Sequence, residues 1–192
     1  MKSINNDTLA RLTAAGFEKC LFRMTAVCPG AWELAGARVY SGKVRDAFRR
    51  AENGNAQVAA LRVKIKGDSP FSTALLFKPE DIKNISDCFV EGSFYETSGK
   101  DQTDSTIIEI GNIVLNALAN TLLRAFNTTA IPSVPAYFTG EPGAVEAWLG
   151  AGPGDFTIVC VAFTMKHGGC SAAAEALAFL PPALTADAAQ RK

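Results

Sequence analysis

Alternating apolar and polar residues predict two consecutive strands in the first half of the chain. Residues 58–66 place apolar side chains at positions 61, 63 and 65 between positively charged ones, which is typical of a strand with one face in water. The turn GDSP leads into FSTALLFK, which we expect to return as a more buried strand. Pro79 and two acidic residues then favour the start of a short helix over residues 80–89.

Helical spacing of apolar residues predicts two long helices. The first should begin after Asn5, a good N-cap residue type, and end before Cys28. We expect its buried face to be formed by Leu9, Leu12, Gly16, Cys20 and Met24. The second long helix covers EIGNIVLNALANTLLRAF, residues 109–126, and should end near Asn127.

The second half of the chain repeats the order of the first. After Pro135, the sequence predicts an extended run AYFTG, a short helix around AVEAWL, a strand TIVCVAFTMK, a turn at HGG and a returning strand SAAAEALAFL. The stretch LLFKP at 75–79 corresponds to LAFLP at 177–181 at a constant offset. We therefore predict one domain made of two tandem repeats, approximately 1–100 and 101–192. The expected fold class is α+β: pseudo-duplicated helix-plus-β-hairpin units form a mostly antiparallel sheet, with the two long helices packed across one face.

Charge and composition narrow the function. The chain has 19 Lys and Arg against 19 Asp and Glu. This balance argues against a nucleic-acid binder and against a polybasic membrane-surface protein. The stretch MKSINNDTLARL lacks the apolar core of a signal peptide, and we expect no apolar stretch long enough to span a bilayer. The expected localisation is cytoplasmic.

The cysteines and the histidine give little material for metal or nucleophilic chemistry. The five cysteines are an odd number without a C-x-x-C pair. We expect Cys20, Cys88 and Cys160 to be core residues, because their neighbours are apolar. His167 is the only histidine, so a His-based triad or a multi-His metal site is not expected.

Polar residues follow one side of the second long helix. Ser105, Glu109, Asn112 and Asn116 are spaced by four, three and four residues. Asparagine costs roughly 0.5–0.7 kcal/mol against alanine inside a helix, so this column calls for an explanation. Two structural explanations are open: Thr106 and Glu109 would form a capping box if the helix began at 106, and Asn112 alone would be tolerated as a surface residue.

Ser105, Glu109, Asn112 and Pro135 fit the spacing Asp/Ser-x-x-x-Glu-x-x-Asn-x(22)-Pro. This resembles the signature of the CheC/CheX/FliY family of response-regulator phosphatases. The resemblance implies a phosphatase that hydrolyses the aspartyl phosphate of a CheY-like receiver domain. If the roles known in that family are carried over to this chain, Glu109 would pair with the receiver lysine beside the phosphoaspartate, and Asn112 would hold the attacking water. Mg²⁺ would arrive already bound to the receiver.

The neighbours of these two residues have supporting parts in this hypothesis. Gly111 would leave room for a close approach, and Pro135 would fix how the helix sits against the next strand. Asn116, on the same helix face, is expected at the periphery of the site. A carboxamide suits the task, since phosphoryl transfer depends on positioning the water more than on deprotonating it.

The first half carries only a remnant of the motif. Asn6 precedes Pro29 at the motif spacing, but Ser3 stands where the glutamate would be, so we expect this site to be lost. The chain has no room for the second domain of FliY-type members, which favours a stand-alone CheC-like or CheX-like protein. The alternative is a non-catalytic adaptor that binds a receiver or a CheD-type deamidase. A small-molecule sensor of the same fold and a homodimer also stay open.

Overall fold

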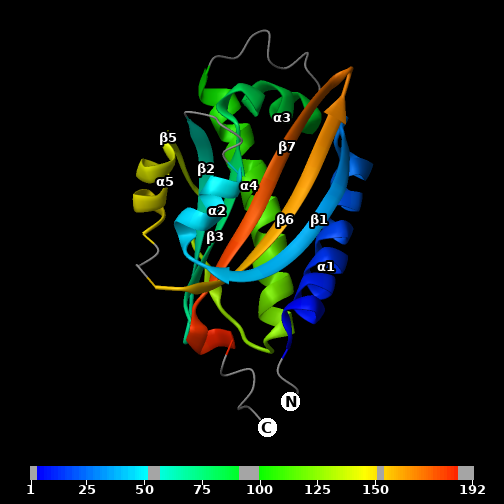
Figure 1. Cartoon of the computed structure of the whole chain (residues 1–192). Coiled ribbons are helices and arrows are strands. Elements are labelled where there is room, and N and C mark those ends of the chain that lie inside the picture. The colour runs from blue at the N-terminus through cyan, green and yellow to red at the C-terminus, as the bar shows by residue number, and fades with distance from the viewer. Residues whose placement is uncertain (1–3, 52–56, 91–99, 151–153, 186–192) are drawn as a thin grey trace.

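The computed structural model describes residues 4–51, 57–90, 100–150 and 154–185 of the chain (Figure 1). In chain order, the elements of the first half are α1 (Asn6–Val27), β1 (Ala31–Gly42), α2 (Val44–Ala51), β2 (Val58–Lys66), β3 (Phe71–Phe77), the 3-10 turn η1 (Pro79–Asp81) and α3 (Ile82–Phe89). Those of the second half are α4 (Lys100–Ala125), β4 (Ile131–Pro132), β5 (Ala136–Gly140), α5 (Pro142–Leu149), β6 (Phe156–His167) and β7 (Cys170–Leu180).

The strands form one seven-stranded sheet in the order β1-β6-β7-β3-β2-β4, with β5 also paired to β2. All of these pairs are antiparallel. The two hairpins β2–β3 and β6–β7 meet at the centre, through β3 and β7. Each half lends its leading strand to the other half's hairpin, since β1 pairs with β6 and β5 pairs with β2. The predicted fold class is confirmed, and the halves interlock in addition to lying side by side.

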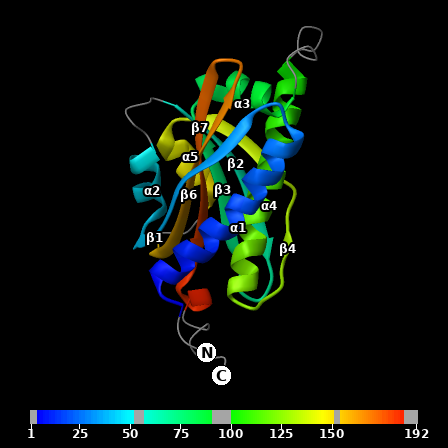
Figure 2. The same ribbon diagram turned by 90° about the vertical axis from the view of Figure 1, so that its right-hand side faces the viewer.

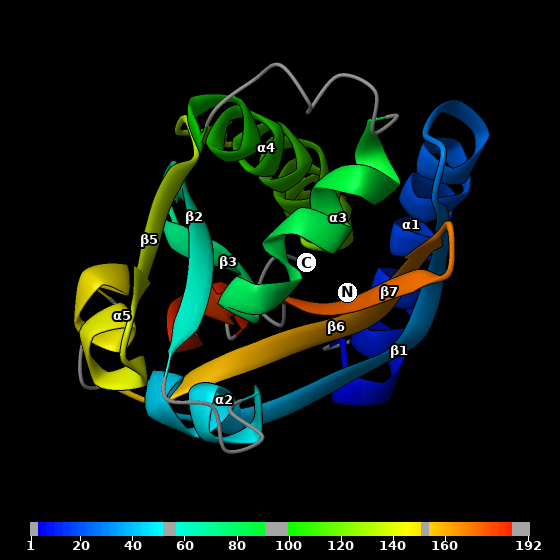
Figure 3. The same cartoon turned by 90° about the horizontal axis from the view of Figure 1, so that it is seen from above.

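Helices cover both faces of the sheet. Alternate side chains of the strands point to opposite faces, and each set has its own apolar cluster. One cluster joins α1, α3 and α4 to residues such as Leu61, Leu75 and Val161. The other joins α2 and α5 to residues such as Ala60 and Leu177. Figure 3 shows α1 and α4 on one side of the curved sheet and α2 and α5 on the other. The two long helices therefore share one face, as the sequence predicts.

The register of the repeat differs from the expected one. Leu75 and Leu177, which correspond in the LLFKP and LAFLP stretches, lie in opposite clusters. Because neighbouring residues of a strand face opposite ways, the offset must differ by one residue. An offset one residue longer, for example, matches Leu75 with Ala178 and Leu76 with Phe179, and the two members of each pair then lie in the same cluster. The residue-by-residue alignment at the predicted offset is therefore wrong, because it matches residues on opposite faces of the sheet.

The buried face of helix α1 differs from the predicted one. Its side chain at Asn5 caps the helix by accepting a hydrogen bond from the Thr8 amide at 2.8 Å. The buried residues are Leu9, Thr13, Phe17, Leu21 and Met24, whereas Leu12 is 45% exposed. The expected face failed because it followed small residues, while the large ring of Phe17 decides which side packs on Phe163, 5.4 Å away between ring centroids.

Strand β1 has no counterpart among the predicted elements. Its sequence AWELAGARVYSG has small residues in place of a clear alternation, so no strand signal stands out. Pairing with β6 over nearly its whole length creates the strand. Long-range contacts of this kind override weak local preference.

Helix α4 is the one described segment long and apolar enough to cross a membrane. Over Ser105–Ala125 the mean hydropathy is 1.4, contrary to our expectation that no such stretch exists. More than half of that stretch is buried inside the fold, where residues such as Val114, Leu115 and Leu118 are fully covered. The apolar content of α4 is thus explained by the core it fills.

Candidate functional site

Except for Pro135, the predicted site residues all lie on helix α4, between its first and last turns. It begins at Lys100, so Thr106 lies inside the helix and the capping-box explanation of Glu109 is wrong. Ile107, Ile110 and Val114 are buried against the sheet, while Glu109 is exposed. The helix therefore positions its polar column by burying the opposite side.

We call Ser105, Glu109, Asn112 and Asn116 the polar ridge. Ser105 and Glu109 are exposed, and the two asparagines are half-buried. Asn116 Nδ2 donates a hydrogen bond to Asn112 Oδ1 at 2.7 Å, as residues four apart on a helix can. This bond constrains the orientation of the Asn112 carboxamide, and Asn112 Nδ2 has no hydrogen-bond acceptor among the described residues, so it can donate to a ligand. Sequence reasoning put Asn116 at the periphery, but the structure puts it in direct contact with Asn112.

Gly111 brings the polar ridge close to the sheet. A Cβ atom at this position would lie 2.8 Å from Leu61 Cδ1 on β2, too close for a real contact. Leu61 in turn pairs with Tyr137 on β5, two residues after Pro135. The glycine therefore sets the distance between α4 and the strand pair that Pro135 precedes. Gly111 is buried and faces the sheet, so the close approach that it permits is to Leu61, and room for a partner stays a prediction.

The segment from Thr128 to Pro135, here called the strap, runs from the end of α4 to β5. Asn127 has a left-handed backbone (φ 51°), and the Thr128 amide donates to the Leu123 carbonyl at 3.0 Å. These are the features of a Schellman helix end, close to where the sequence predicts it. Figure 2 shows α4 with α1 on one side and β4, within the strap, on the other.

The strap is fixed to β2 by two hydrogen bonds between Ser133 and Lys64. The Ser133 amide donates to the Lys64 carbonyl at 2.8 Å, and the Lys64 amide donates to Ser133 Oγ at 3.0 Å. Ile131 is 74% exposed and Val134 is 84% exposed. The strap thus presents two large apolar side chains on a firmly held backbone beside α4. Pro135 itself is half-buried at its end.

The remnant of the motif in the first half lies apart from the polar ridge. Asn6 is the first residue of α1 and is exposed, and Pro29 follows that helix directly. Ser3 lies outside the described residues. The polar ridge and the Asn6 end of α1 are separate, because α1 packs on β1 and meets α4 near Gly16 and Thr121.

The thiols differ in their surroundings. Cys88 and Cys160 are buried, as predicted, and burial raises their pKa values to about 11 and about 12. Cys20 is half-buried and packs at the edge of the main apolar cluster, where it lines a groove between α1 and α4. Among the described residues, no three His, Cys, Asp or Glu side chains are grouped closely enough to hold a metal ion.

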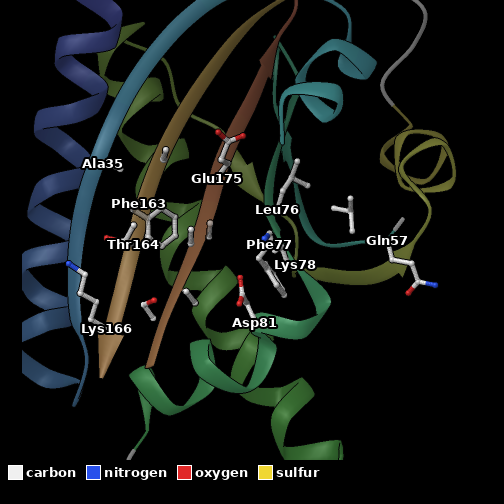
Figure 4. A pocket seen from close by; sticks show the side chains of 16 residues that line it. Ala35, Gln57, Leu76, Phe77, Lys78, Asp81, Phe163, Thr164, Lys166 and Glu175 are labelled. Carbon is white, nitrogen blue, oxygen red and sulfur yellow. The ribbon is translucent and has the colours of Figure 1, made fainter. Parts of the chain in front are cut away.

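A hollow of about 550 Å³ lies over the sheet, away from the polar ridge (Figure 4). Its lining includes Asp81, Lys166 and Glu175. Glu175 forms an ion pair with Arg38 at 2.9 Å, and burial raises the pKa of Asp81. Most of the other lining residues are alanines and further small or apolar side chains. None of the predicted site residues contributes to this hollow.

Comparison with known proteins finds similarity in structure alone. No protein-family model matches the chain, and no curated protein matches it in sequence. Thermotoga maritima FliY superposes with a TM-score of 0.66 at 11% identity, over 96% of this chain and 93% of that one. The FliM middle domain from H. pylori gives 0.60 at 7% identity, over 95% of both chains. The chemotaxis protein CheX from Desulfovibrio desulfuricans gives 0.55 at 11% identity, over 90% of this chain and 99% of that one. The chain therefore has the fold of the CheC/CheX/FliY family, which FliM middle domains share.

Proposed function

We propose that this protein is a phosphatase that hydrolyses the aspartyl phosphate of a CheY-like receiver domain, in chemotaxis or a related two-component signal. The observation that carries the proposal is the polar ridge: a carboxylate and an oriented carboxamide, one helical turn apart, on the exposed side of α4. The shared fold with FliY and CheX supports it. The protein would act in the cytoplasm, where receivers are found.

In this reaction a water oxygen attacks the phosphorus and the bond to the aspartate oxygen breaks, which yields phosphate and a free receiver carboxylate. The transition state is loose, so the water must be held in line. Asn112 Nδ2 would donate to the water or to a phosphoryl oxygen. Its Oδ1 has a second lone pair beyond the one that Asn116 uses, and would accept from the water.

Glu109 would hold the partner in place. Its carboxylate is exposed one turn before Asn112, where it would pair with the lysine beside the phosphoaspartate. Mg²⁺ would be supplied by the phosphorylated receiver, which binds it next to the phosphoryl group. Gly111 and Pro135 would act indirectly, by setting how α4 lies against β2 and β5.

A receiver-binding or CheD-binding adaptor is the second candidate. One observation favours protein binding without chemistry: FliM middle domains share the fold, and one of the FliM structures is a complex with SpeE. Fold alone does not decide between these activities. The phosphatase and a receiver-binding adaptor both require the polar ridge to contact a receiver, but only the phosphatase requires Asn112 for turnover.

The deciding experiment follows the decay of phosphorylated CheY-like receivers in Mg²⁺ with no added protein, with wild type and with Asn112→Ala. We expect wild type to speed the decay and Asn112→Ala to lose about 100-fold or more of that effect. Asn6→Ala is the matched control, because it removes an exposed asparagine from the other long helix, and it should act as wild type does.

Two results would contradict the proposal. If wild type and Asn112→Ala accelerated the decay equally, the polar ridge would not be the site of the reaction. Binding of several receivers without faster decay would make the protein an adaptor.

A further inference from the structure

The polar ridge borders a long groove between α1 and α4, which Figure 2 shows side by side. The groove has a volume of about 1240 Å³, and its lining includes the apolar side chains of Met24, Ile113 and Ala117. The two helices are in close contact where Gly16 meets Thr121: a Cβ there would lie 2.5 Å from Thr121 Oγ1. Both of these residues also line the groove.

Positive charges lie on both walls of this groove. Lys19 and Arg23 stand one turn apart on α1, and Arg124 stands on α4. None of the described lining residues is Asp or Glu, and none of the three cations forms an ion pair with a described residue. This grouping is notable in a chain whose net charge is zero.

Uncovered groups lie along the same groove. Leu12 is 45% exposed and Val27 is 82% exposed, one toward each end of the lining part of α1. Asn116 Oδ1 is buried without a hydrogen-bond partner among the described residues. Apolar side chains and an unused acceptor of this kind are typical of a surface that a partner covers.

We propose that the groove between α1 and α4 binds an acidic amphipathic helix of a partner protein. A helix laid between two helices places an apolar stripe against the apolar lining residues. Carboxylates on both sides of that stripe would then meet Lys19 and Arg23 on one wall and Arg124 on the other. A basic or uncharged helix would leave these cations facing apolar or like-charged groups. The proposal does not depend on whether the polar ridge is catalytic.

A pair of synthetic peptides tests the charge requirement. Both are 18-residue amphipathic helices with leucine at helical spacing; one has glutamate and the other lysine at the remaining positions. Fluorescence anisotropy at low and moderate salt measures their binding to the full chain. We expect the glutamate peptide to bind at least about tenfold tighter than the lysine peptide, with an advantage that shrinks as salt rises.

Charge reversal on the protein locates the binding. Lys19→Glu/Arg23→Glu should weaken the glutamate peptide at least about tenfold. Lys43→Glu/Arg45→Glu is the matched control, because it reverses the same charges at exposed positions at the start of α2, across the sheet. Equal loss in both double variants, or no saturable binding by wild type, would overturn the proposal.

The cysteines provide a footprint that does not depend on the variants folding. Cys20 and Cys28 line the groove, whereas Cys170 is exposed at the start of β7. Alkylation at pH 8.5, followed by mass spectrometry, should be slowed by the glutamate peptide at Cys20 and Cys28 only. Protection of Cys170 to the same extent would place the peptide elsewhere. A wild-type dimer that Val27→Asp dissociates, with no peptide footprint, would make a second copy the occupant.

Discussion

Helices α1 and α4 hold corresponding places in the two halves of the chain, yet their exposed sides differ. Helix α4 carries the polar ridge, with Glu109 and Asn112 above a close contact to β2. Helix α1 carries charged and apolar residues, and its only trace of the motif is Asn6 at its first turn. Their buried sides are alike, since both pack on the same face of the sheet. Two helices that pack on the same face of one sheet can therefore present different side chains to solvent.

The loops after the two helices sharpen this contrast. Helix α1 is followed almost at once by Gly30, where a Cβ would lie 2.7 Å from the Cys88 carbonyl oxygen, so the chain passes tightly against α3. Helix α4 is followed by the longer strap, fixed to β2 through Ser133. The end of α1 thus packs against α3, whereas the end of α4 leads into an extended segment that pairs with β2.

The largest expected effect comes from the core that α1 supplies. Phe17 is fully buried against Phe163, so Phe17→Ala should lower the free energy of unfolding by about 3–5 kcal/mol. Phe22→Ala is the control, because Phe22 on the same helix is 76% exposed; it should change stability by no more than about 0.5 kcal/mol. Urea denaturation followed by circular dichroism measures both. Similar losses would mean that α1 does not pack as described.

Substitution of Glu109 tests whether the exposed side of α4 contacts the receiver. If it pairs with a receiver lysine, Glu109→Ala should raise the KM for the phosphorylated receiver about 10- to 100-fold, by about 1.4–2.7 kcal/mol. Glu18→Ala removes an equally exposed glutamate from α1 and should leave KM unchanged. Thermal melting should show no difference between the two variants. A large change with Glu18→Ala would place the receiver on α1.

The sequence was informative where pattern and packing agree. The alternation in β2 and the long apolar side of α4 predict elements that the structure has, and so does the order of the second half. It was misleading where a single large side chain decides, as Phe17 does in α1, and where strand β1 depends on a distant partner. The polar ridge could be found from spacing, but the hydrogen bond from Asn116 to Asn112 depends on side-chain orientation, which spacing does not fix.

Substitutions of two helix glycines compare how tightly α4 packs on the sheet, at Gly111, with how tightly α1 and α4 pack on each other, at Gly16. Gly111→Ala would push Cβ against Leu61, which is fully buried, and overpacking of this kind costs about 1–3 kcal/mol. Gly16→Ala would meet Thr121 more closely, with its Cβ 2.5 Å from Thr121 Oγ1 and 3.1 Å from Thr121 Cβ. The Thr121 hydroxyl is held by a 2.8 Å hydrogen bond to the Ala117 carbonyl, whereas the end of the Leu61 side chain can adjust. We therefore expect the greater loss of unfolding free energy for Gly16→Ala, and a raised KM for Gly111→Ala alone. A greater loss for Gly111→Ala would make the contact with the sheet the tighter of the two.

The smallest effect concerns Asn116, which has no equivalent role on α1. Its bond to Asn112 is worth about 1 kcal/mol, so Asn116→Ala should lower kcat about fivefold and leave KM unchanged, because the carboxamide of Asn112 would then sample other orientations. Asn116→Gln keeps a side-chain donor and should recover part of the loss. A purely structural role would instead lower the melting temperature without this change in kcat. If Asn116→Ala raised KM and left kcat intact, Asn116 would be a contact to the partner, and the orientation of Asn112 would have another source.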